Sequence, residues 1–478
     1  MGKAYEPYHR ERIDHWDSVA HIRAGKRDSG RYYHKRLGEI YRNLIMPGQR
    51  VLEIGCERGD LLGRLNAKEA VGVDFSGRML REGILSNPEI IYVRADAHHL
   101  ALAPDFKFDF IILSDLLNDV WDVQQIIREI GRYVHQRSRI VINTYSRLWE
   151  PFLKLADRLG LARPNLIQNW LTVQDIENLL YLEGFEVVRH WEEILWPFDT
   201  PFLSSLFNKF LVKIWPFKYL ALANFIVARA IPRRNLELDD VKVSVVIPAR
   251  NEKGNIEEIF ARMPKLGNST ELIFIEGHSS DETYPEIERQ IASHTEWDCI
   301  LEKQEGTGKG DAVRLGFSLA SGKILMILDA DLTVPPEDLP RFYQALISGR
   351  GDFANGVRLV YPMENRAMQF LNLAGNKFFS SAFSWLLGQP VKDTLCGTKV
   401  IWSREYDIIT QNRSYFGDID PFGDFDLLLG AARQSMKIVD IPIRYRERRY
   451  GSTNIQRWKH GLLLVEMFWL AAKRLKFI

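Results

Sequence analysis

Short, uninterrupted apolar runs recur along the chain, and a loop and a helix-like segment follow each of them. The runs form two series, residues 50–55, 70–75, 108–115 and 139–143 in the first half and residues 241–250, 271–276, 323–331 and 437–443 in the second. Strands that are apolar throughout are buried on both faces, as in parallel sheets that helices cover on each side. The sequence therefore predicts an α/β fold with two separate parallel sheets.

A charged segment separates the two series. Residues 232–240, PRRNLELDD, contain a proline and have no apolar period, which is typical of a linker. A chain of 478 residues is expected to form two to three domains. We predict one domain over residues 1–235 and a second over residues 236–478.

Composition excludes several classes of protein. The formal net charge of +1 gives no overall field that favours nucleic acid. Cys56, Cys299 and Cys396 lie far apart, which argues against a disulfide framework or a zinc site and suits a reducing compartment. The polar N-terminal stretch lacks the apolar region of a signal peptide. We expect a cytoplasmic protein.

Two segments are basic and apolar. Residues 201–234 hold six Lys/Arg and no acidic residue, and residues 444–478 hold nine Lys/Arg against two Glu. No uncharged apolar run reaches the roughly 18 residues that a membrane span needs. Both segments could lie on an anionic membrane surface, as peripheral contacts at its inner face. The alternative is core-packed helices with solvated lysines.

Polar residues follow four expected strands of the first half. Glu53, Gly55 and Gly59 lie in or next to the loop after the strand at residues 50–55, where glycine lets the backbone approach a ligand. Asp74 ends the strand at residues 70–75, in position to accept hydrogen bonds from ribose hydroxyls. Asp96 follows a further strand, which leads into RADAHHL, and could meet an adenine amino group there. Ser114, followed by Asp115, ends the strand at residues 108–115, so that these side chains converge on one crevice.

The same segments resemble known motifs. VLEIGCERGDLL, VGVDFSGRML, ADAHHL and FDFIILSDLLND look like the successive motifs of class I S-adenosylmethionine-dependent methyltransferases, over roughly residues 30–231. The resemblance implies a Rossmann-like domain. It places Glu53, Gly55 and Gly59 at the methionine part of the donor, Asp74 at the ribose and Asp96 at the adenine.

One residue departs from that pattern. Glu57 stands where the family has a central glycine, and its carboxylate could pair with the donor's ammonium or crowd the loop. The alternative to a methyltransferase is a domain that binds the donor without catalysis and serves as a scaffold. Methyl transfer needs mainly alignment of the two reactants. His98, His99, Asp115 and Asn118 could orient or deprotonate an acceptor.

The aromatic and basic residues Tyr32, Tyr33, His34 and Lys35 precede the first strand. They could form a lid over the donor site, but a surface helix is the expected structure.

In the second half, Asp329 and Asp331 end an apolar strand and flank a single alanine. Two such carboxylates repel each other when buried, unless a cation lies between them. Oxygen ligands suit Mg²⁺ or Mn²⁺, especially where substrate phosphates complete the coordination shell. The alternative is an acidic turn before Pro335 and Pro336.

The surroundings of this pair resemble the GT-A fold of family 2 glycosyltransferases, close to the dolichol-phosphate mannosyltransferase type. The matching segments are SVVIPARNEKGNIEEIF, IFIEGHSSDET, GKGDAVRLGFSLASGKILMILDADL, DTLCGTKVIWSRE and GDFDLLLGAARQSMKIVDIPIRYRERRYGSTN, over roughly residues 241–460.

The resemblance implies a role for each of several residues. Pro248, Asn251, Glu252, Glu276 and Asp281 would bound the nucleotide pocket. Lys309 would meet phosphate, Asp329 and Asp331 would hold the metal, and Arg358, Arg366 and Arg448 would face phosphates of donor or acceptor. Two positions depart from the family, because His278 lies in the usual Asp-Asp-Gly-Ser turn and Thr333 replaces a glutamine.

The acceptor decides whether the reaction needs a base. A sugar hydroxyl needs one, and Asp424 or Asp426 is the candidate. A lipid phosphate is already ionised, and the Arg-rich segment 444–451 would clamp it, with Arg448 next to the reaction centre.

The order of domains resembles bacterial bifunctional proteins of surface-polysaccharide or glycolipid assembly. We expect transfer from a nucleotide-sugar to a polyprenyl-phosphate or glycan acceptor, together with S-adenosylmethionine-dependent methyl transfer. The alternative is a glycosyltransferase with a non-catalytic S-adenosylmethionine-binding domain.

Overall fold

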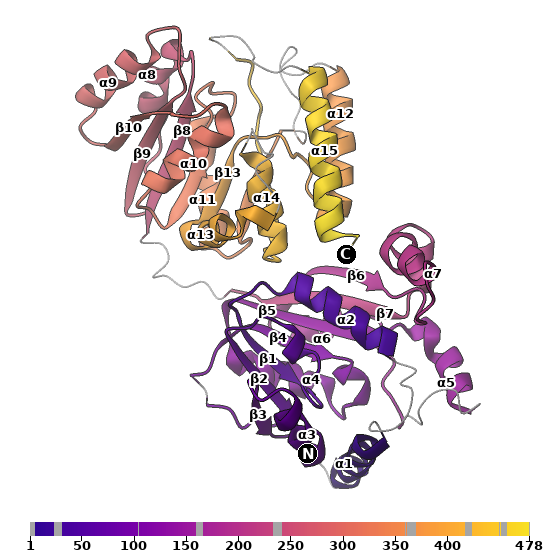
Figure 1. The fold of residues 1–478 in the computed structure, drawn as a ribbon. Helices are drawn as coiled ribbons and strands as arrows, with labels where there is room; N and C mark the ends of the chain where they lie inside the picture. The colour runs from indigo at the N-terminus through magenta and orange to yellow at the C-terminus, as the bar shows by residue number, and fades with distance from the viewer. Residues whose placement is uncertain are drawn as a thin grey trace. The chain divides into compact units, whose positions relative to one another are not determined.

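The computed structural model describes residues 5–22, 31–103, 105–158, 166–232, 241–358, 360, 370–415, 423–448, 450 and 457–477. The chain forms two compact units, Met1–Ile231 with Lys476–Ile478, and Pro232–Leu475 (Figure 1). The boundary predicted between residues 235 and 236 lies outside the described residues.

The first unit contains a seven-stranded sheet in the order β3-β2-β1-β4-β5-β7-β6. Its strands are β1 (Arg50–Ile54), β2 (Glu69–Asp74), β3 (Ile91–Arg94), β4 (Phe108–Ser114), β5 (Val134–Tyr145), β6 (Phe185–Glu193) and β7 (Ala223–Ala230). Its helices are α1 (Tyr5–Ile22), α2 (Arg31–Leu44), α3 (Gly77–Ser86), α4 (Val123–Ile130), α5 (Glu150–Arg158), α6 (Val173–Leu182) and the short α7 (Leu203–Ser205).

The second unit also contains a seven-stranded sheet, in the order β10-β9-β8-β11-β13-β12-β14. Its strands are β8 (Lys242–Ala249), β9 (Ser269–Glu276), β10 (Asp298–Lys303), β11 (Ile324–Ile327), β12 (Phe353–Val357), β13 (Lys399–Trp402) and β14 (Ile438–Pro442). Its helices are α8 (Lys253–Arg262), α9 (Thr283–Ser293), α10 (Lys309–Leu319), α11 (Leu339–Ile347), α12 (Phe370–Leu387), α13 (Ser403–Gln411), α14 (Asp424–Arg433) and α15 (Arg457–Leu475).

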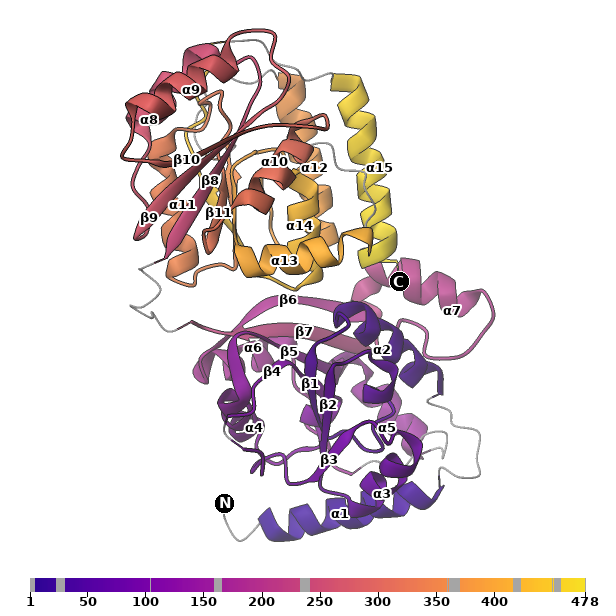
Figure 2. The same cartoon turned by 60° about the vertical axis from the view of Figure 1, so that its left-hand side comes forward.

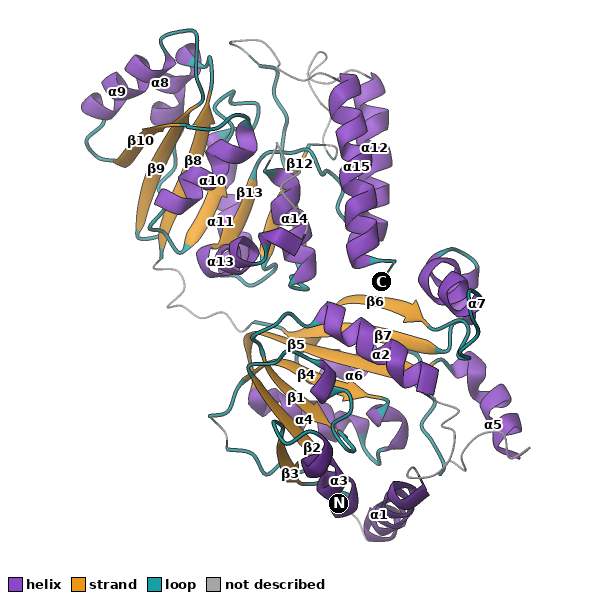
Figure 3. Ribbon diagram, viewed as in Figure 1, coloured by secondary structure: helices purple, strands orange, loops and turns teal. Residues whose placement is uncertain are grey.

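Helices cover both faces of each sheet (Figures 2 and 3). The predicted α/β class is therefore confirmed, but the expectation of purely parallel sheets is wrong. β7 runs antiparallel to β5 and β6, and β13 runs antiparallel to β11 and β12. An apolar run does not reveal strand direction, because a central strand is buried on both faces whichever way it runs.

The apolar runs are the interior of each unit. In β1, for example, Val51, Leu52 and Ile54 are almost fully buried. Burying one such side chain contributes about 1.5–3 kcal/mol. Both faces of the first sheet carry a separate apolar cluster. Side chains cap the N-termini of several helices. At the start of α3, for example, the Ser76 hydroxyl accepts a hydrogen bond from the Met79 backbone N–H.

Among the described residues, none of the helices is both apolar enough and long enough to traverse a bilayer.

Candidate active sites

The loop after β1 in the first unit keeps the shape that a glycine-rich loop has. Gly55 has φ +75°, and a Cβ atom there would lie 2.8 Å from Leu116 Cδ1. Glu57 has φ +48°, in the left-handed region that glycine favours. The glutamate therefore departs from the motif in its side chain but not in its backbone. Gly59, further along the loop, also has a positive φ.

Asp74, at the end of β2, is buried beside this loop. Its Oδ1 accepts a hydrogen bond from the Ser76 backbone N–H at 2.8 Å, and its Oδ2 accepts one from the Glu57 N–H at 2.9 Å. Burial raises its pKa to about 6, against the lowering effect of these two hydrogen bonds. The carboxylate is thus held in place by the backbone of the loop that it adjoins.

Glu53 is a buried carboxylate whose Oε2 atom has no hydrogen-bond partner among the residues that the structure describes. Burial, followed by the nearby carboxylates of Glu57 and Asp74, raises its pKa well above the ordinary value. A buried acceptor without a partner is costly unless a ligand satisfies it. A cationic ligand suits the site, and S-adenosylmethionine carries both an ammonium and a sulfonium group, so these residues fit the expected donor.

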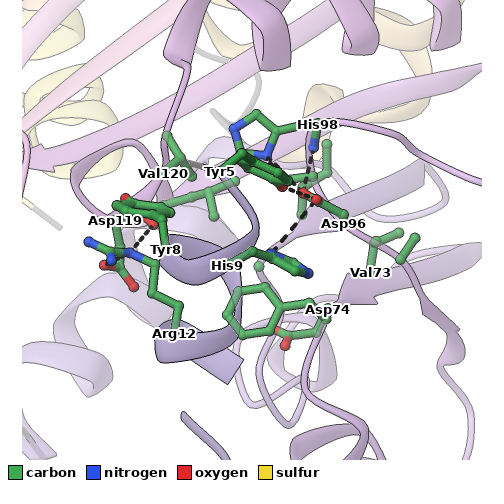
Figure 4. Close-up of a pocket in the computed structure, with 16 residues that line it drawn as sticks. Tyr5, Tyr8, His9, Arg12, Val73, Asp74, Asp96, His98, Asp119 and Val120 are labelled. Atoms are coloured by element: carbon green, nitrogen blue, oxygen red, sulfur yellow. Dashed lines mark hydrogen bonds and ion pairs between the residues drawn. The ribbon is translucent and has the colours of Figure 1, made fainter. Parts of the chain in front are cut away.

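Asp96 lies after β3 and is already occupied by the protein's own side chains. The Tyr5 hydroxyl in α1 donates to its Oδ2, and the His98 ring nitrogen Nδ1 lies 2.8 Å from its Oδ1 (Figure 4). Burial raises the pKa of Asp96, but the hydrogen bonds from His98 and Tyr5 lower it by more. The pKa therefore lies below its usual range. His98 Nε2 accepts a hydrogen bond from the Asp122 N–H at 3.1 Å, so the buried ring of this histidine links Asp96 to the backbone of Asp122.

Helix α1 covers the crevice at these strand ends. Its residues Tyr5, His9 and Arg12 line a cavity of about 30 Å³ together with Asp74 and Asp96 (Figure 4). This volume holds only a few water molecules. Helix α1 thus narrows the space at these strand ends. Sequence reasoning missed these residues, because a polar segment upstream of the fold gives no signal of where it packs.

The lid hypothesis pointed to the wrong segment. Tyr33 in α2 is buried, and its hydroxyl lies 3.0 and 2.9 Å from the two carboxylate oxygens of Asp115. The expectation that Tyr32, Tyr33, His34 and Lys35 form a surface helix is therefore wrong for Tyr33, because its ring is part of the interior.

Asp115 follows Ser114 at the end of β4 and has φ +53°. It is half-buried, and its Oδ1 also accepts a hydrogen bond from Asn143 Nδ2 at 2.7 Å. Burial raises its pKa to about 7, against the opposing hydrogen bond from Tyr33. The crevice thus contains a carboxyl group whose pKa lies near neutral pH. Of the other acceptor candidates, His99 is exposed, and Asn118 is buried with Nδ2 bonded to the Asn169 carbonyl at 3.0 Å.

In the second unit, Asp329 and Asp331 follow β11, and each pairs with a basic side chain. Lys309 Nζ lies 2.5 Å from Asp329 Oδ1, and Arg448 Nη2 donates to Asp331 Oδ2 at 2.6 Å. Arg448 Nη1 also lies 3.3 Å from Glu252 Oε1. The carboxylate pair is therefore balanced by two cations from distant parts of the chain.

The Asp329 side chain is closely confined. A Cβ atom at Gly397 would lie 2.1 Å from Asp329 Oδ2, so a larger residue there would displace the Asp329 carboxylate. Thr333 bonds Asp331 Oδ1 through its hydroxyl at 2.8 Å and its backbone N–H at 3.1 Å. The threonine thus orients the second aspartate.

A divalent cation fits this site only with help from substrate. Among the described residues, no group of three or more His, Cys, Asp and Glu side chains could hold a metal ion. Two carboxylates with substrate phosphates are a usual shell for Mg²⁺. The donor set therefore fits the expected metal.

The residues expected at the nucleotide pocket surround the ends of β8 and β9. Pro248 lies within β8, and Asn251 has φ +56° with its Oδ1 accepting the Ser280 N–H at 2.7 Å. Glu276 ends β9 and accepts the Ser279 N–H at 2.5 Å. Asp281 accepts hydrogen bonds from the Thr283 N–H at 3.0 Å and from the Tyr450 hydroxyl at 3.4 Å. These polar groups build the loops at the strand ends.

Comparison with known proteins identifies both halves. Residues 244–408 match the family model for glycosyl transferase family 2, and residues 25–190 match a model for a methyltransferase domain. The dolichyl-phosphate hexose transferase of Haloferax volcanii is 30% identical over 223 residues, which cover 46% of this chain and 89% of that protein. The chain belongs to glycosyl transferase family 2.

Other similarities cover less. The dolichol-phosphate mannosyltransferase of Pyrococcus furiosus is 34% identical over 122 residues, which are 25% of this chain and 34% of that protein, so the chain spans about a third of its length. An S-adenosylmethionine-dependent methyltransferase from Mesorhizobium loti is 22% identical, over 41% of this chain and 96% of that one, with a TM-score of 0.31. The enzyme joins a methyltransferase domain to a family 2 glycosyltransferase domain.

In the glycosyltransferase domain, the structure separates the two candidate bases. Asp424 begins α14, is buried, and has an Oδ1 atom without a hydrogen-bond partner in the described part of the chain, 3.7 Å from the ion-pairing Lys399 Nζ. Although burial lowers the pKa of Lys309, the charges of Asp329 and then Asp424 raise it, so Asp424 lies near the Lys309–Asp329 pair. Asp426 instead pairs with Arg413 at 3.3 Å and with Arg314 at 3.8 Å.

The expected phosphate-binding arginines are only partly placed. Arg358 forms a two-point pair with the buried Asp393, at 2.7 Å from Nε and 2.9 Å from Nη2. Two of the three guanidinium nitrogens of Arg358 thus bind the Asp393 carboxylate and not a phosphate. Arg366 lies outside the described residues.

Proposed function

We propose that the enzyme transfers a sugar from a nucleotide-sugar to a polyprenyl phosphate and methylates a glycan or lipid of the same assembly route. The cluster of Lys309, Asp329, Asp331 and Arg448 carries the first half of this proposal. The names of the relatives, a dolichyl-phosphate hexose transferase and a dolichol-phosphate mannosyltransferase, support a lipid-phosphate acceptor. We assign the methyltransferase domain to residues 1–235 and the glycosyltransferase domain to residues 236–478.

In the sugar transfer, a bond forms between an acceptor phosphate oxygen and the anomeric carbon, and the bond from that carbon to the nucleoside diphosphate breaks. A divalent cation at Asp329 and Asp331 would stabilise the departing diphosphate. Lys309 binds a phosphate oxygen of the donor once it exchanges its contact with Asp329. Arg448 binds the acceptor phosphate in the same way, in exchange for Asp331, because a guanidinium fork matches phosphate oxygens.

The acceptor determines the role of Asp424. A phosphate acceptor is ionised already, and Asp424 then serves as a fixed negative charge that orients Lys309. A glycan hydroxyl would need a base, and Asp424 has a buried oxygen that lacks a hydrogen-bond partner among the described residues. We favour the phosphate, since Lys309 and Arg448 both lie against the carboxylate pair.

In the methyl transfer, the bond from sulfur to the methyl carbon breaks as the acceptor's heteroatom forms a bond to that carbon. The proton of the acceptor passes to Asp115, whose pKa of about 7 suits a base at neutral pH. Glu53 orients the donor through its amino group, and Asp74 through its ribose.

The C-terminal helix supports peripheral contact with the inner face of the membrane. α12 and α15 lie side by side (Figure 1), and α15 exposes the large apolar residues Leu462, Val465 and Trp469 with the basic Lys473 and Arg474 nearby. Such a surface suits an enzyme whose acceptor is a lipid phosphate.

The second candidate is a glycosyltransferase with a non-catalytic S-adenosylmethionine-binding domain. The closed α1 and the Glu57 side chain favour it. One assay separates the candidates. The purified chain is given methyl-labelled S-adenosylmethionine, polyprenyl phosphate and a panel of UDP- and GDP-sugars with Mn²⁺. Label in the lipid or glycan fraction supports two enzymes. Tight donor binding without transferred label supports the second candidate, and no sugar transfer from any donor refutes the first half of the proposal.

A further inference from the structure

The methyltransferase domain carries a long insertion at the edge of its sheet. β6 ends at Glu193 and β7 begins at Ala223, and these two residues pair directly in the sheet. A short turn would therefore suffice, but the chain uses residues 194–222. Ala223 also pairs with Tyr145, the last residue of β5. The insertion thus leaves the sheet at the carboxyl ends of the parallel strands, the same edge that holds Asp74, Asp96 and Asp115.

Buried polar groups fix the underside of this insertion. Glu193 pairs with Lys213 of the insertion and with Arg36 of α2, the latter at 3.3 Å. Asn208, fully buried, accepts the Trp196 N–H at 2.8 Å and donates to the Trp196 carbonyl at 2.6 Å. A segment tied down in this way has one defined outer face.

That outer face is strongly apolar. Phe202 is 93% exposed and Trp215 74% exposed, and Leu206 and Tyr219 are also open to solvent. α5 adds Phe152 and Leu155, and Leu148 before it continues the same face at the spacing of helical turns. The Trp149 indole N–H donates to the Leu220 carbonyl at 2.9 Å, which joins the turn directly before α5 to the insertion. We call Phe152, Leu155, Phe202, Leu206, Trp215 and Tyr219 the apolar platform.

Lysine is the main charged residue of the insertion. No acidic residue occurs from position 200 to position 236, whereas Lys209 and Lys218 lie within the insertion and are partly exposed. The exposed Asp199 precedes this stretch, and α5 carries Glu150, which pairs with Lys154, and Asp157. Lys218 Nζ lies 4.9 Å from the Tyr219 ring centroid. Aromatic rings with interspersed lysines match the interface of an anionic bilayer, where rings lie at head-group level and lysines meet lipid phosphates.

We propose that the apolar platform docks the methyltransferase domain on an anionic lipid bilayer. The platform and the donor crevice share one edge of the sheet, so the bilayer delivers the methyl acceptor to that edge. The acceptor is accordingly a lipid-linked molecule, a statement that rests on the proposed methyl transfer. The docking itself does not depend on either catalytic activity.

A fluorescent label on the platform tests this directly. The full chain carries Cys299→Ser, which leaves Cys56 and Cys396, both buried. One variant adds Phe202→Cys and a matched control adds Leu85→Cys, which is 85% exposed in the last turn of α3. Both are labelled with an environment-sensitive dye and mixed with vesicles of phosphatidylglycerol and phosphatidylcholine. We expect a blue shift at position 202 and none at position 85.

Substitutions then measure the contribution of the platform. In the unlabelled chain, Trp215→Ser with Phe152→Ser should lower vesicle affinity by at least roughly tenfold, since losing buried aromatic area weakens interfacial binding. In the labelled Phe202→Cys chain, the matched substitution Leu462→Ser on α15 should leave the blue shift at position 202 intact. Circular dichroism checks that each variant folds, and sugar transfer to polyprenyl phosphate in detergent is measured on the same proteins. If the proposed glycosyltransferase activity is absent, the sugar-transfer assay will show no activity in any of these proteins, whatever their vesicle affinity.

Three results would overturn the proposal. One is sedimentation with vesicles while the label at position 202 stays in a water-like environment. Another is the absence of vesicle binding. The third is a shift at position 202 that grows with protein concentration without lipid, which would show a second copy of the chain on the platform.

Discussion

Replacing Asp115 with asparagine tests whether the methyltransferase site holds a carboxylate at the expense of stability. The pKa of Asp115 is raised from 3.8 to about 7, chiefly by burial. That difference corresponds to about 4 kcal/mol of disfavour for the ionised form. Asparagine keeps the size of the side chain, tolerates φ +53°, and can still accept the hydrogen bond from Asn143. Asp115→Asn should therefore stabilise the protein without its donor.

The sign of the pH dependence follows from the direction of the shift. Because the folded pKa of Asp115 lies above the unfolded value, the native state retains this proton to higher pH, and the group reduces stability increasingly from about pH 4 to pH 7. The gap in free energy of unfolding between variant and wild type should widen by about 2–3 kcal/mol from pH 5 to pH 8. That corresponds to several degrees in Tm for a domain of this size.

Thermal unfolding of the apo proteins at pH 5 and pH 8 measures this gap, with Ser205→Ala as a surface control. Methyl transfer by the variant should fall at least about a hundredfold if Asp115 accepts the proton. A variant less stable than wild type at pH 8, or a gap that does not widen with pH, would refute the reasoning.

Three further outcomes follow from the same geometry. Asp74→Ala should weaken S-adenosylmethionine binding ten- to a hundredfold, about 1.5–3 kcal/mol for charge-assisted hydrogen bonds, and isothermal titration showing equal affinity would contradict the ribose assignment. Tyr5→Phe removes a hydroxyl that competes for Asp96, so donor affinity should rise by up to about tenfold; weaker binding would mean that Tyr5 contacts the donor instead. Chelation by EDTA should abolish sugar transfer and added Mn²⁺ should restore it. Full activity in EDTA would contradict the assignment of a metal to Asp329 and Asp331.

Much of the fold could be predicted from the sequence, because buried strands appear in it as apolar runs. β1, β2, β4 and β8 coincide with such runs. The edge strand β10 escaped this reasoning, since it is only partly buried and carries charged residues. The direction of β7 and β13 depends on long-range pairing, which an apolar pattern does not encode.

The candidate sites were predicted in part. Strand ends converge at one edge of a parallel sheet, which is why Asp74, Asp329 and Asp331 were identifiable as site residues. The family resemblance also named Lys309 and Arg448 as phosphate-binding residues, but their ion pairs with the aspartates were not predicted, because both reach the aspartates from distant positions in the chain. Tyr5 was missed for the same reason. The difference between Asp424 and Asp426 follows from which side of α14 each faces, and that depends on the helices around it.

The central claim is that the chain contains two working sites that act independently. Asp331→Ala separates them most directly, with S-adenosylmethionine binding and sugar transfer to polyprenyl phosphate measured on one preparation. The account predicts that sugar transfer disappears while the affinity for S-adenosylmethionine stays at the wild-type value. Loss of both, or retention of sugar transfer, would contradict it.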